Sequence, residues 1–490
     1  MLWRMTDSVR DLYDKLPYPA LSHPAGHPGL MAATARLSGM PHATAPHDCR
    51  TLDIGCASGH HLLALAAQFP TSEFVGIDLS RDAIRRAREA AEAVGLKNVR
   101  FEVADLSDWR DESEPFDYLV AHGMLSWLDD SHKSQLLDLC AGLLGEHGVA
   151  YFSYSTMPGG ALRREAAEHV KALGQLGDDL DERLSRLAAA AAMNATPYGQ
   201  HLAAIFEDFR RKGPEILVFD ELGPVHDPLY FSQVVRWTES RGLRYLGESS
   251  LAANLPPELD PAALEKLRAL ESDPISYQQT LDLLTGRTHR TSLFCRDDAL
   301  SGQPITSAET LHLHARLVIH PLPGKAIHGE IVGSLHAELA AAYPHTRPVA
   351  DLIESCTRRL GRDWEPERGI KTIADWLFLA ARLGWIELRA DPIQFPTHPP
   401  TRPRLSLLNR HFARSGEALV DGFHRSFRLP ASHAAVAARM DGNHTADDLE
   451  KLAATESPEL DFRPWLAHLA SRGMFGTRDA AADITSSGTS

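Results

Sequence analysis

Two glycines and an acid near residue 55 have the spacing of a nucleoside-binding turn. Gly55 and Gly59 lie in the stretch TLDIGCASG, and Asp78 follows Gly59 by 19 residues in FVGIDLS. We interpret these residues as a strand, a glycine-rich turn that opens a helix, and a second strand that ends in a carboxylate. Such glycines let the backbone approach a ligand, and an acid at that strand end accepts hydrogen bonds from a ribose diol. The pattern predicts a bound nucleoside.

A second acid, at the head of the turn, indicates which nucleoside is bound. Dinucleotide cofactors use G-x-G-x-x-G with a helix amino end open to two phosphates, whereas this turn begins with Asp53 and has Ala57 before Gly59. Asp53 repels phosphate but suits the cationic amino-acid part of S-adenosylmethionine. A third strand ending at Asp105, placed to meet an adenine edge, and a fourth strand from Phe116 continue the pattern. Together these signals predict a class I methyltransferase domain.

The candidate cofactor-binding residues occupy the turn and the strand ends. They are Asp53, Gly55, Cys56, Ala57, Gly59, Asp78, Leu79, Asp105, Leu106 and His122. Asp53 has an alternative interpretation as an acid that stabilises the turn, and Asp105 has one as a cap of its strand end.

Strands and helices alternate over residues 50–155, which predicts a parallel sheet covered on both faces. The sixth and seventh strands of a methyltransferase sheet are delayed, to 243–247 and 289–296, and the seventh is antiparallel. The predicted fold class is therefore α/β, with a Rossmann-like seven-stranded sheet, a helical insertion and α-rich winged-helix-like C-terminal domains. The helical residues 161–215 are expected to pack for stability or dimerisation, with direct substrate contact as the alternative.

The predicted segments follow from these elements and from changes in composition. They are an N-terminal lid (1–48), a cofactor-binding core (49–160), a helical insertion and regulatory region that completes the sheet (161–300), a middle winged-helix-like domain (301–395), a C-terminal winged-helix domain (404–480) and a disordered tail (481–490). The last two domains look like copies of one another. In each copy a threonine initiates a helix and a Trp-Leu pair lies eight residues before a glycine, at Thr346, Trp376 and Gly384, and at Thr445, Trp465 and Gly473.

Composition limits the classes of partner. The chain has 490 residues, which predicts two to four domains, and its 43% hydrophobic content is that of a soluble globular protein. A formal net charge of −15 argues against nucleic acid as the main partner, so a protein-binding or structural role is expected for the winged helices. No run approaches 18 apolar residues and the start lacks a signal-peptide core, so we expect a cytoplasmic protein with no membrane insertion.

The cysteines and histidines do not predict a metal site. The five cysteines are widely spaced and form no C-x-x-C pair, so we expect them to be reduced and buried. The pairs His60-His61 and His312-x-His314 bring no third ligand at a known spacing.

Several longer motifs together resemble one bacterial family. They are YDKLPYPALSHPAGHPGLMAATARLSG, CRTLDIGCASG, FDYLVAHGMLSWL, GVAYFSYSTMPGG, DPLYFSQVVRWTESRGLRYLGES and RPRLSLLNRHFARSG. The chain resembles S-adenosylmethionine-dependent methyltransferases with a methyltransferase regulatory domain, the group that contains protein lysine methyltransferases acting on outer-membrane proteins. The resemblance implies a cytoplasmic enzyme with a cofactor domain, a helical middle region and a C-terminal winged helix.

Methyl transfer is an in-line displacement, so the protein must mainly align the acceptor and exclude water; a lysine acceptor must also lose a proton. The catalytic candidates are His122 and Tyr154, at the ends of the fourth and fifth strands, and Tyr18 in the leader. Trp127 is expected to form a wall of the methionine or acceptor pocket, and His27 to help Tyr18 close it. The alternatives are a satisfied half-buried histidine for His122 and simple packing under the lid for Tyr18 and His27.

The function expected from these patterns is methyl transfer from S-adenosylmethionine to lysine side chains of a protein. One alternative is methylation of a small molecule or a peptide natural product. The other is a non-catalytic regulatory or scaffold protein that binds the cofactor, suggested by Ala57 and by His60-His61, where the chain departs from the family pattern.

Overall fold

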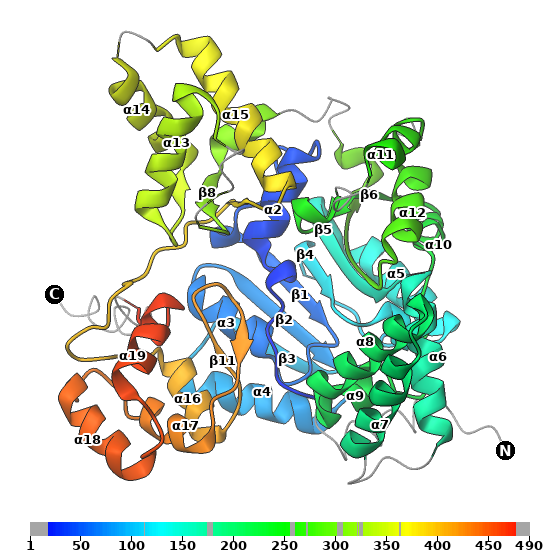
Figure 1. The fold of residues 1–490 in the computed structure, drawn as a ribbon, viewed down its shortest axis with the longest axis horizontal. Coiled ribbons are helices and arrows are strands. Elements are labelled where there is room, and N and C mark those ends of the chain that lie inside the picture. The colour runs from blue at the N-terminus through cyan, green and yellow to red at the C-terminus, as the bar shows by residue number, and fades with distance from the viewer. Residues whose placement is uncertain are drawn as a thin grey trace.

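A seven-stranded sheet forms the centre of the molecule (Figure 1). The computed structural model describes residues 18–476 except 112, 174–179, 255–259, 271–272, 301–306, 321, 323–326 and 362–363, so the first 17 residues of the predicted lid and the predicted tail at 481–490 lie outside the described residues. The strand order is β3-β2-β1-β4-β5-β7-β6, and only β7 runs antiparallel to its neighbours β5 and β6. The strands are β1 (Arg50–Ile54), β2 (Glu73–Asp78), β3 (Val99–Val103), β4 (Phe116–Ala121), β5 (Leu144–Ser155), β6 (Leu243–Glu248) and β7 (His289–Arg296). This confirms the predicted methyltransferase sheet.

Helices cover both faces of the sheet, as buried parallel strands require. Successive side chains of a strand point to opposite faces. On β2, Phe74 packs with α3 (His60–Gln68) and α4 (Arg81–Val94), whereas Val75 packs with α5 (Asp130–Leu143). Helix α10 (Phe231–Glu239) joins the core on the side of α5. The carboxyl ends of β1, β2 and β4 therefore stand at one edge, held from both sides.

The described part of the leader packs against the sheet. Helix α2 (Pro28–Leu37) buries Met31 and Ala35 against Tyr118, Val120 and Tyr151 of β4 and β5. Residues 18–23 precede it without helix or strand and run along the carboxyl edge of the sheet.

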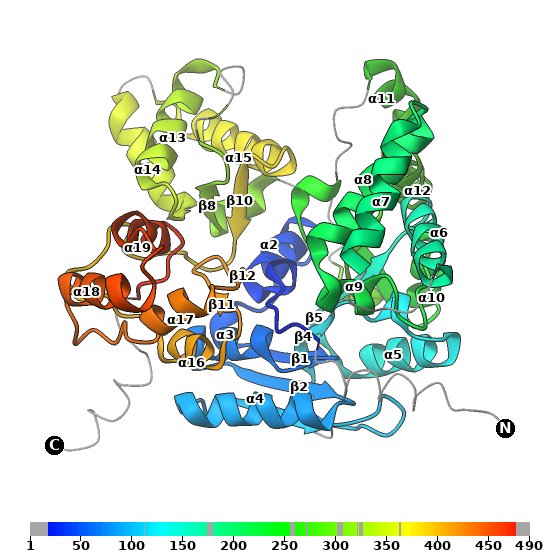
Figure 2. The same ribbon diagram turned by 60° about the horizontal axis from the view of Figure 1, so that its bottom comes forward.

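The described residues of the predicted helical insertion form four helices beside the sheet (Figure 2). They are α6 (Gly159–Ala172), α7 (Leu180–Met193), α8 (Pro197–Lys212) and α9 (Pro214–Asp220). They enclose a small hydrophobic core of their own, with Phe206 and Phe209 of α8 at its centre. Gly213 separates α8 from α9 with a φ of +76°, so the chain turns sharply there.

Two further units follow the sheet. The first consists of β8 (His314–Leu317), α13 (Gly329–Ala342), β9 (Arg347–Pro348), α14 (Val349–Leu360), α15 (Pro366–Arg382) and β10 (Ile386–Arg389). The second consists of α16 (Leu407–Ser415), β11 (Leu419–Val420), β12 (Ser426–Phe427), α17 (Ala431–Ala437), α18 (Ala446–Glu456) and α19 (Phe462–Ser471). No helix within the described residues is long and apolar enough to cross a membrane.

The two units share the features that the sequence repeat predicts, with one exception. After α15 the Trp385 amide donates to the Ala380 carbonyl, and after α19 the Met474 amide donates to the Leu469 carbonyl, each next to a glycine with positive φ. Thr445 caps α18 through a capping box. The expectation that Thr346 initiates a helix is wrong: α14 begins after Pro348, and the Thr346 hydroxyl binds the backbone of Ile393 instead. The winged-helix assignment of both units stays a prediction.

The second unit shares one hydrophobic core with α3 and α4. Phe412 of α16 stacks on the His60 ring with centroids 3.9 Å apart, and the His61 Nδ1 lies 2.8 Å from the His424 Nε2. The two histidines that depart from the family pattern thus form part of the contact between the sheet domain and this unit.

Candidate active site

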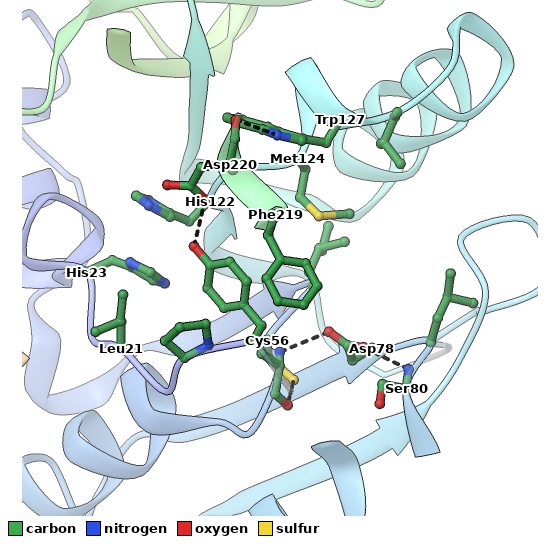
Figure 3. A pocket seen from close by; sticks show the side chains of 18 of the residues that line it. Leu21, His23, Cys56, Asp78, Ser80, His122, Met124, Trp127, Phe219 and Asp220 are labelled. Carbon is green, nitrogen blue, oxygen red and sulfur yellow. Dashed lines mark hydrogen bonds between the residues drawn. The ribbon is translucent and has the colours of Figure 1, made fainter. Parts of the chain in front are cut away.

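The turn after β1 adopts a backbone that requires its small residues. Gly55 and Gly59 have φ of +77° and +75°, and a Cβ on Gly55 would lie 2.5 Å from the Met124 Sδ. The Ala57 amide donates to Asp78 Oδ2 at 2.9 Å, and the Ser80 amide donates to Asp78 Oδ1 at 2.8 Å. Asp78 therefore joins the turn to β2 while its carboxylate faces the cavity (Figure 3).

A cavity of about 490 Å³ extends from this turn to the insertion. One end, which we call the turn end, is lined by Gly55, Cys56, Ala57, Asp78, Leu79, Asp105 and Leu106. The opposite end, which we call the acidic end, is lined by Tyr18, Trp127, Arg163, Asp208, Lys212, Asp220 and Glu221. His122 and Met124, from the segment after β4, also line the cavity, as does Phe219. Figure 3 shows Asp78 and Asp220 far apart across this space, with Phe219 between them.

The turn end fits S-adenosylmethionine. Asp78 offers a carboxylate at the second strand end, Leu79 and Leu106 provide apolar walls for a flat purine, and Asp105 follows the third strand. The positive φ of Gly55 leaves the backbone open to a ligand. Eight of the predicted cofactor-binding residues line the cavity, namely Gly55, Cys56, Ala57, Asp78, Leu79, Asp105, Leu106 and His122.

The other two predicted cofactor-binding residues, Asp53 and Gly59, do not line the cavity. Gly59 precedes the first turn of α3, and a Cβ there would collide with the Phe101 ring. The Asp53 side chain is buried, and burial, followed by the charge of Asp78, raises the pKa of its carboxyl to about 8. A cation next to Asp53 would restore its charged form. A direct contact of Asp53 with the cofactor stays a prediction.

Asp220 is the centre of the acidic end. The Tyr18 hydroxyl donates to Asp220 Oδ1 at 3.2 Å, and the Trp127 Nε1 donates to the Asp220 carbonyl at 3.2 Å. Lys212 Nζ lies 3.3 Å from Asp220 Oδ2. Burial raises the pKa of Asp220, and the nearby Lys212 offsets part of that rise.

Glu221 is held charged by two cations. Lys212 Nζ donates to Glu221 Oε1 at 2.8 Å, and Arg163 Nη2 donates to the same oxygen at 2.5 Å. Although burial favours the protonated form, these cations keep the pKa of Glu221 below its usual value. Arg163 also pairs with Asp208 at 2.9 Å. Three carboxylates thus face two cations, which leaves this end one unit negative when all five groups are charged.

His122 lines the cavity as predicted, in a neutral form. Its ring stacks on His23 with centroids 3.6 Å apart, and its Nδ1 lies 2.9 Å from the Tyr151 hydroxyl. Burial, followed by the proximity of His23 and His289, lowers the pKa of His122 well below its usual value. An uncharged imidazole at this place orients polar groups but is a weak proton acceptor.

Two predicted site residues lie elsewhere. Tyr154 is fully buried and its hydroxyl lies 3.1 Å from the Ser292 Oγ, because alternation along β5 turns Ser155 to the cavity and Tyr154 away from it. His27 caps α2 by accepting from the Gly29 amide and contacts Arg389, so it is a packing residue of the leader. The assignments of Tyr154 to catalysis and of His27 to the pocket are therefore wrong. Tyr18 and Trp127 line the cavity.

The sequence analysis missed most of the acidic end. Arg163, Asp208 and Lys212 come from the helical residues 161–215, for which we expected packing rather than substrate contact, and they line the cavity. Asp220 and Glu221 follow at the end of α9. The only local signal was a pair of acids, Asp220 and Glu221, directly after the apolar run ILVF. Among the described residues, no group of three or more histidines, cysteines or acids is arranged to hold a metal ion.

Comparisons with known proteins agree with this geometry. Residues 46–193 match a family described as a methyltransferase domain, and residues 213–296 match one described as a predicted methyltransferase regulatory domain. An uncharacterised protein of Rickettsia prowazekii is 27% identical over 293 residues, which cover 58% of this chain and 53% of that protein. Trans-aconitate 2-methyltransferase of Variovorax paradoxus is 30% identical over 154 residues, 31% of this chain and 49% of that enzyme. The chain thus spans about half the length of these two relatives.

A solved structure extends the similarity to the C-terminal units. PKMT2 from Rickettsia typhi, in complex with AdoHcy, superposes with a TM-score of 0.77 at 20% identity and covers 93% of this chain and 98% of that one. The fold is therefore shared from the sheet to the second C-terminal unit. The regulatory match contains β6, β7 and the two acids Asp220 and Glu221, so it completes both the sheet and the cavity. The chain therefore carries an S-adenosylmethionine-dependent methyltransferase domain, followed by a segment that matches a predicted methyltransferase regulatory domain.

Proposed function

We propose that this protein transfers methyl groups from S-adenosylmethionine to lysine side chains of a protein. The observation that carries the proposal is the partly buried Asp220 carboxylate at the acidic end, where it accepts from Tyr18 and pairs with Lys212. When bound, S-adenosylmethionine supplies a methyl group activated by the positive charge on its sulfur. The chain's own residues must then select the acceptor, orient it and exclude water from it.

The charge of the acidic end favours a cationic acceptor. Three carboxylates, Asp208, Asp220 and Glu221, face Arg163 and Lys212. An incoming ammonium balances the remaining negative charge, whereas a carboxylate acceptor would meet repulsion in a partly buried site. This electrostatic arrangement supports an amine rather than an acid such as trans-aconitate, although an enzyme named for that substrate is a relative over part of the chain.

The surrounding side chains suit the alignment of a slender amine. Asp220 receives hydrogen bonds from the acceptor nitrogen and directs its lone pair, once the proton has left to water, toward the turn end. Trp127 and Phe219 wall the passage between the two ends and exclude water. Tyr18 fixes the Asp220 carboxylate from the leader, so residues 18–23 act as a lid. Because His122 is neutral and its pKa is lowered, it positions neighbouring groups by hydrogen bonding and does not act as the proton acceptor.

The size of the protein supports a polypeptide acceptor. The name PKMT2 abbreviates protein lysine methyltransferase, and that structure shares the two C-terminal units as well as the sheet. A small metabolite needs no such units. We assign these two units to contact with the acceptor protein. The proposal also includes a cytoplasmic location and a homodimer whose subunits meet at the helical insertion.

Transfer of a labelled methyl group tests the proposal. The full chain is incubated with methyl-labelled S-adenosylmethionine and a lysate of the cells that make it, and the precipitated protein is hydrolysed in acid. We expect the label to elute as methyllysines, and the Asp78→Asn variant to give none. Label released from the intact protein as methanol by mild base before hydrolysis, or label in small molecules alone, would refute lysine methylation. Cofactor binding without transfer to any acceptor would favour a scaffold.

A further inference from the structure

One lysine of the chain itself projects into the cavity. Among the described residues that line it, Lys212 is the single lysine, at the last position of α8. Its side chain is 28% exposed, and its Nζ donates to both Asp220 and Glu221. A lysine side chain therefore already lies in the cavity that also contains the turn end.

Lys212 occupies the place that the proposed acceptor would take. The Asp220 carboxylate accepts from Tyr18 through one oxygen and from Lys212 through the other. An external ammonium directed to Asp220 competes with Lys212 for this carboxylate. The structure thus shows an ammonium at the acceptor carboxylate, supplied by the protein.

The neighbouring backbone gives Lys212 freedom to move. A lysine ammonium sits on a flexible four-carbon stem. The next residue, Gly213, has a φ of +76° and open space around it, and Pro214 begins α9. Glu221, the second partner of Lys212, keeps Arg163 when Lys212 leaves. Departure of Lys212 therefore leaves one carboxylate, Asp220, without its cation.

We propose that Lys212 is an internal methyl acceptor, so that the protein methylates itself at this residue. This proposal rests on the lysine specificity proposed above. The Lys212 ammonium first loses a proton to water. The nitrogen lone pair then forms a bond to the methyl carbon of S-adenosylmethionine, the carbon–sulfur bond breaks with its electron pair going to sulfur, and S-adenosylhomocysteine leaves. The product is a methylated ammonium at Lys212.

Self-methylation also affects external acceptors. Lys212 and an incoming lysine compete for Asp220, so the unmodified side chain restrains turnover until it is displaced. A methylated nitrogen is bulkier and retains fewer N–H donors for Asp220 and Glu221. Modification of Lys212 therefore weakens its hold on the acceptor carboxylate and opens the site.

The test uses the full chain with no added acceptor. Purified protein is incubated with methyl-labelled S-adenosylmethionine, and peptide mass spectrometry locates the label. We expect methylation at Lys212 with a rate per molecule that does not change on dilution, because the acceptor is in the same chain. Lys212→Arg, which keeps the positive charge, should lower incorporation about tenfold or more. Lys171→Arg is the matched control: Lys171 pairs with Glu168 outside the cavity, and its substitution should leave incorporation unchanged.

The outcomes separate this inference from the proposed function. Cofactor binding is measured by calorimetry, and methylation of external protein lysines is measured in the same preparation. An unmodified Lys212 in protein that methylates external lysines overturns self-methylation and leaves the proposed function intact. Self-methylation at Lys212 is also overturned if the Lys212→Arg variant incorporates as much label as the unchanged protein, on other lysines of the chain. Binding without transfer to Lys212 or to any external lysine refutes both proposals.

Discussion

The turn end and the acidic end of the cavity are built in different ways. The turn end comes from consecutive strand ends between residues 54 and 106, where each cavity-lining residue lies at the end of a strand or shortly after it. The acidic end joins Tyr18 of the leader, Trp127 after β4 and Asp220 at the end of α9, with Tyr18 and Asp220 separated by 202 positions. The turn end is thus encoded locally in the sequence, whereas the acidic end, where we propose that the acceptor binds, depends on the tertiary packing of an insertion.

The largest effect is expected from a substitution that disrupts only the turn end. Gly55→Ala adds a Cβ where the Met124 Sδ would be 2.5 Å away, at a φ of +77°. We expect affinity for S-adenosylhomocysteine to fall about a hundredfold or more, measured by calorimetry. Gly95→Ala is the matched control, since Gly95 has a φ of +76° but open space around it. Gly95→Ala should cost about 1 kcal/mol of stability and leave the affinity unchanged. Equal losses of affinity in both variants would contradict the role of Gly55.

A smaller effect is expected when the acid behind the turn loses its charge. The raised pKa of Asp53, about 8, means that the folded state binds this proton more tightly than the unfolded state. Its contribution to stability therefore falls as the pH rises from about 4 toward 8. Asp53→Asn should stabilise the cofactor-free protein by about 1–3 kcal/mol at pH 8, with no gain at pH 4, and weaken cofactor binding.

Thermal melts at pH 4 and pH 8, with and without cofactor, measure the gain in stability and the loss of cofactor binding in Asp53→Asn. Glu73→Gln provides a control acid on the next strand, where the side chain is half exposed and pairs with Arg50. A stability gain that is the same at pH 4 and pH 8 would show that Asp53 is not the titrating group.

The smallest expected effect concerns His122, which lies between the two ends. Because the pKa of His122 is lowered, its ring is uncharged from neutral pH upward, and no limb near pH 6.5 is expected in the pH profile of kcat. The rate should instead rise with pH as the proposed acceptor amine loses its proton. His122→Asn should lower kcat by less than about tenfold and keep the shape of the profile. A limb near pH 6.5 that disappears in His122→Asn would identify His122 as the base.

The contrast between the two ends also explains what the sequence predicts. Strand ends, the turn glycines and Asp78 follow from hydrophobic pattern and spacing, so the seven strands and most turn-end residues were predictable. Tyr154 was misplaced by a single residue of strand alternation, since Ser155 is the one that reaches the cavity. Asp220 and Lys212 were not predictable, because no local pattern reveals which face of a distant helix packs over the sheet.

Affinity for S-adenosylhomocysteine in two matched variants tests most directly whether the two ends have separate roles. Asp78→Asn and Asp220→Asn each replace one cavity carboxylate by an amide of the same size. We predict that Asp78→Asn weakens the affinity by about tenfold or more. Asp220→Asn should change it by less than about twofold while lowering kcat/KM for the proposed lysine acceptor about 10–100-fold. An equal loss of affinity in Asp220→Asn, or unchanged affinity in Asp78→Asn, would contradict the account.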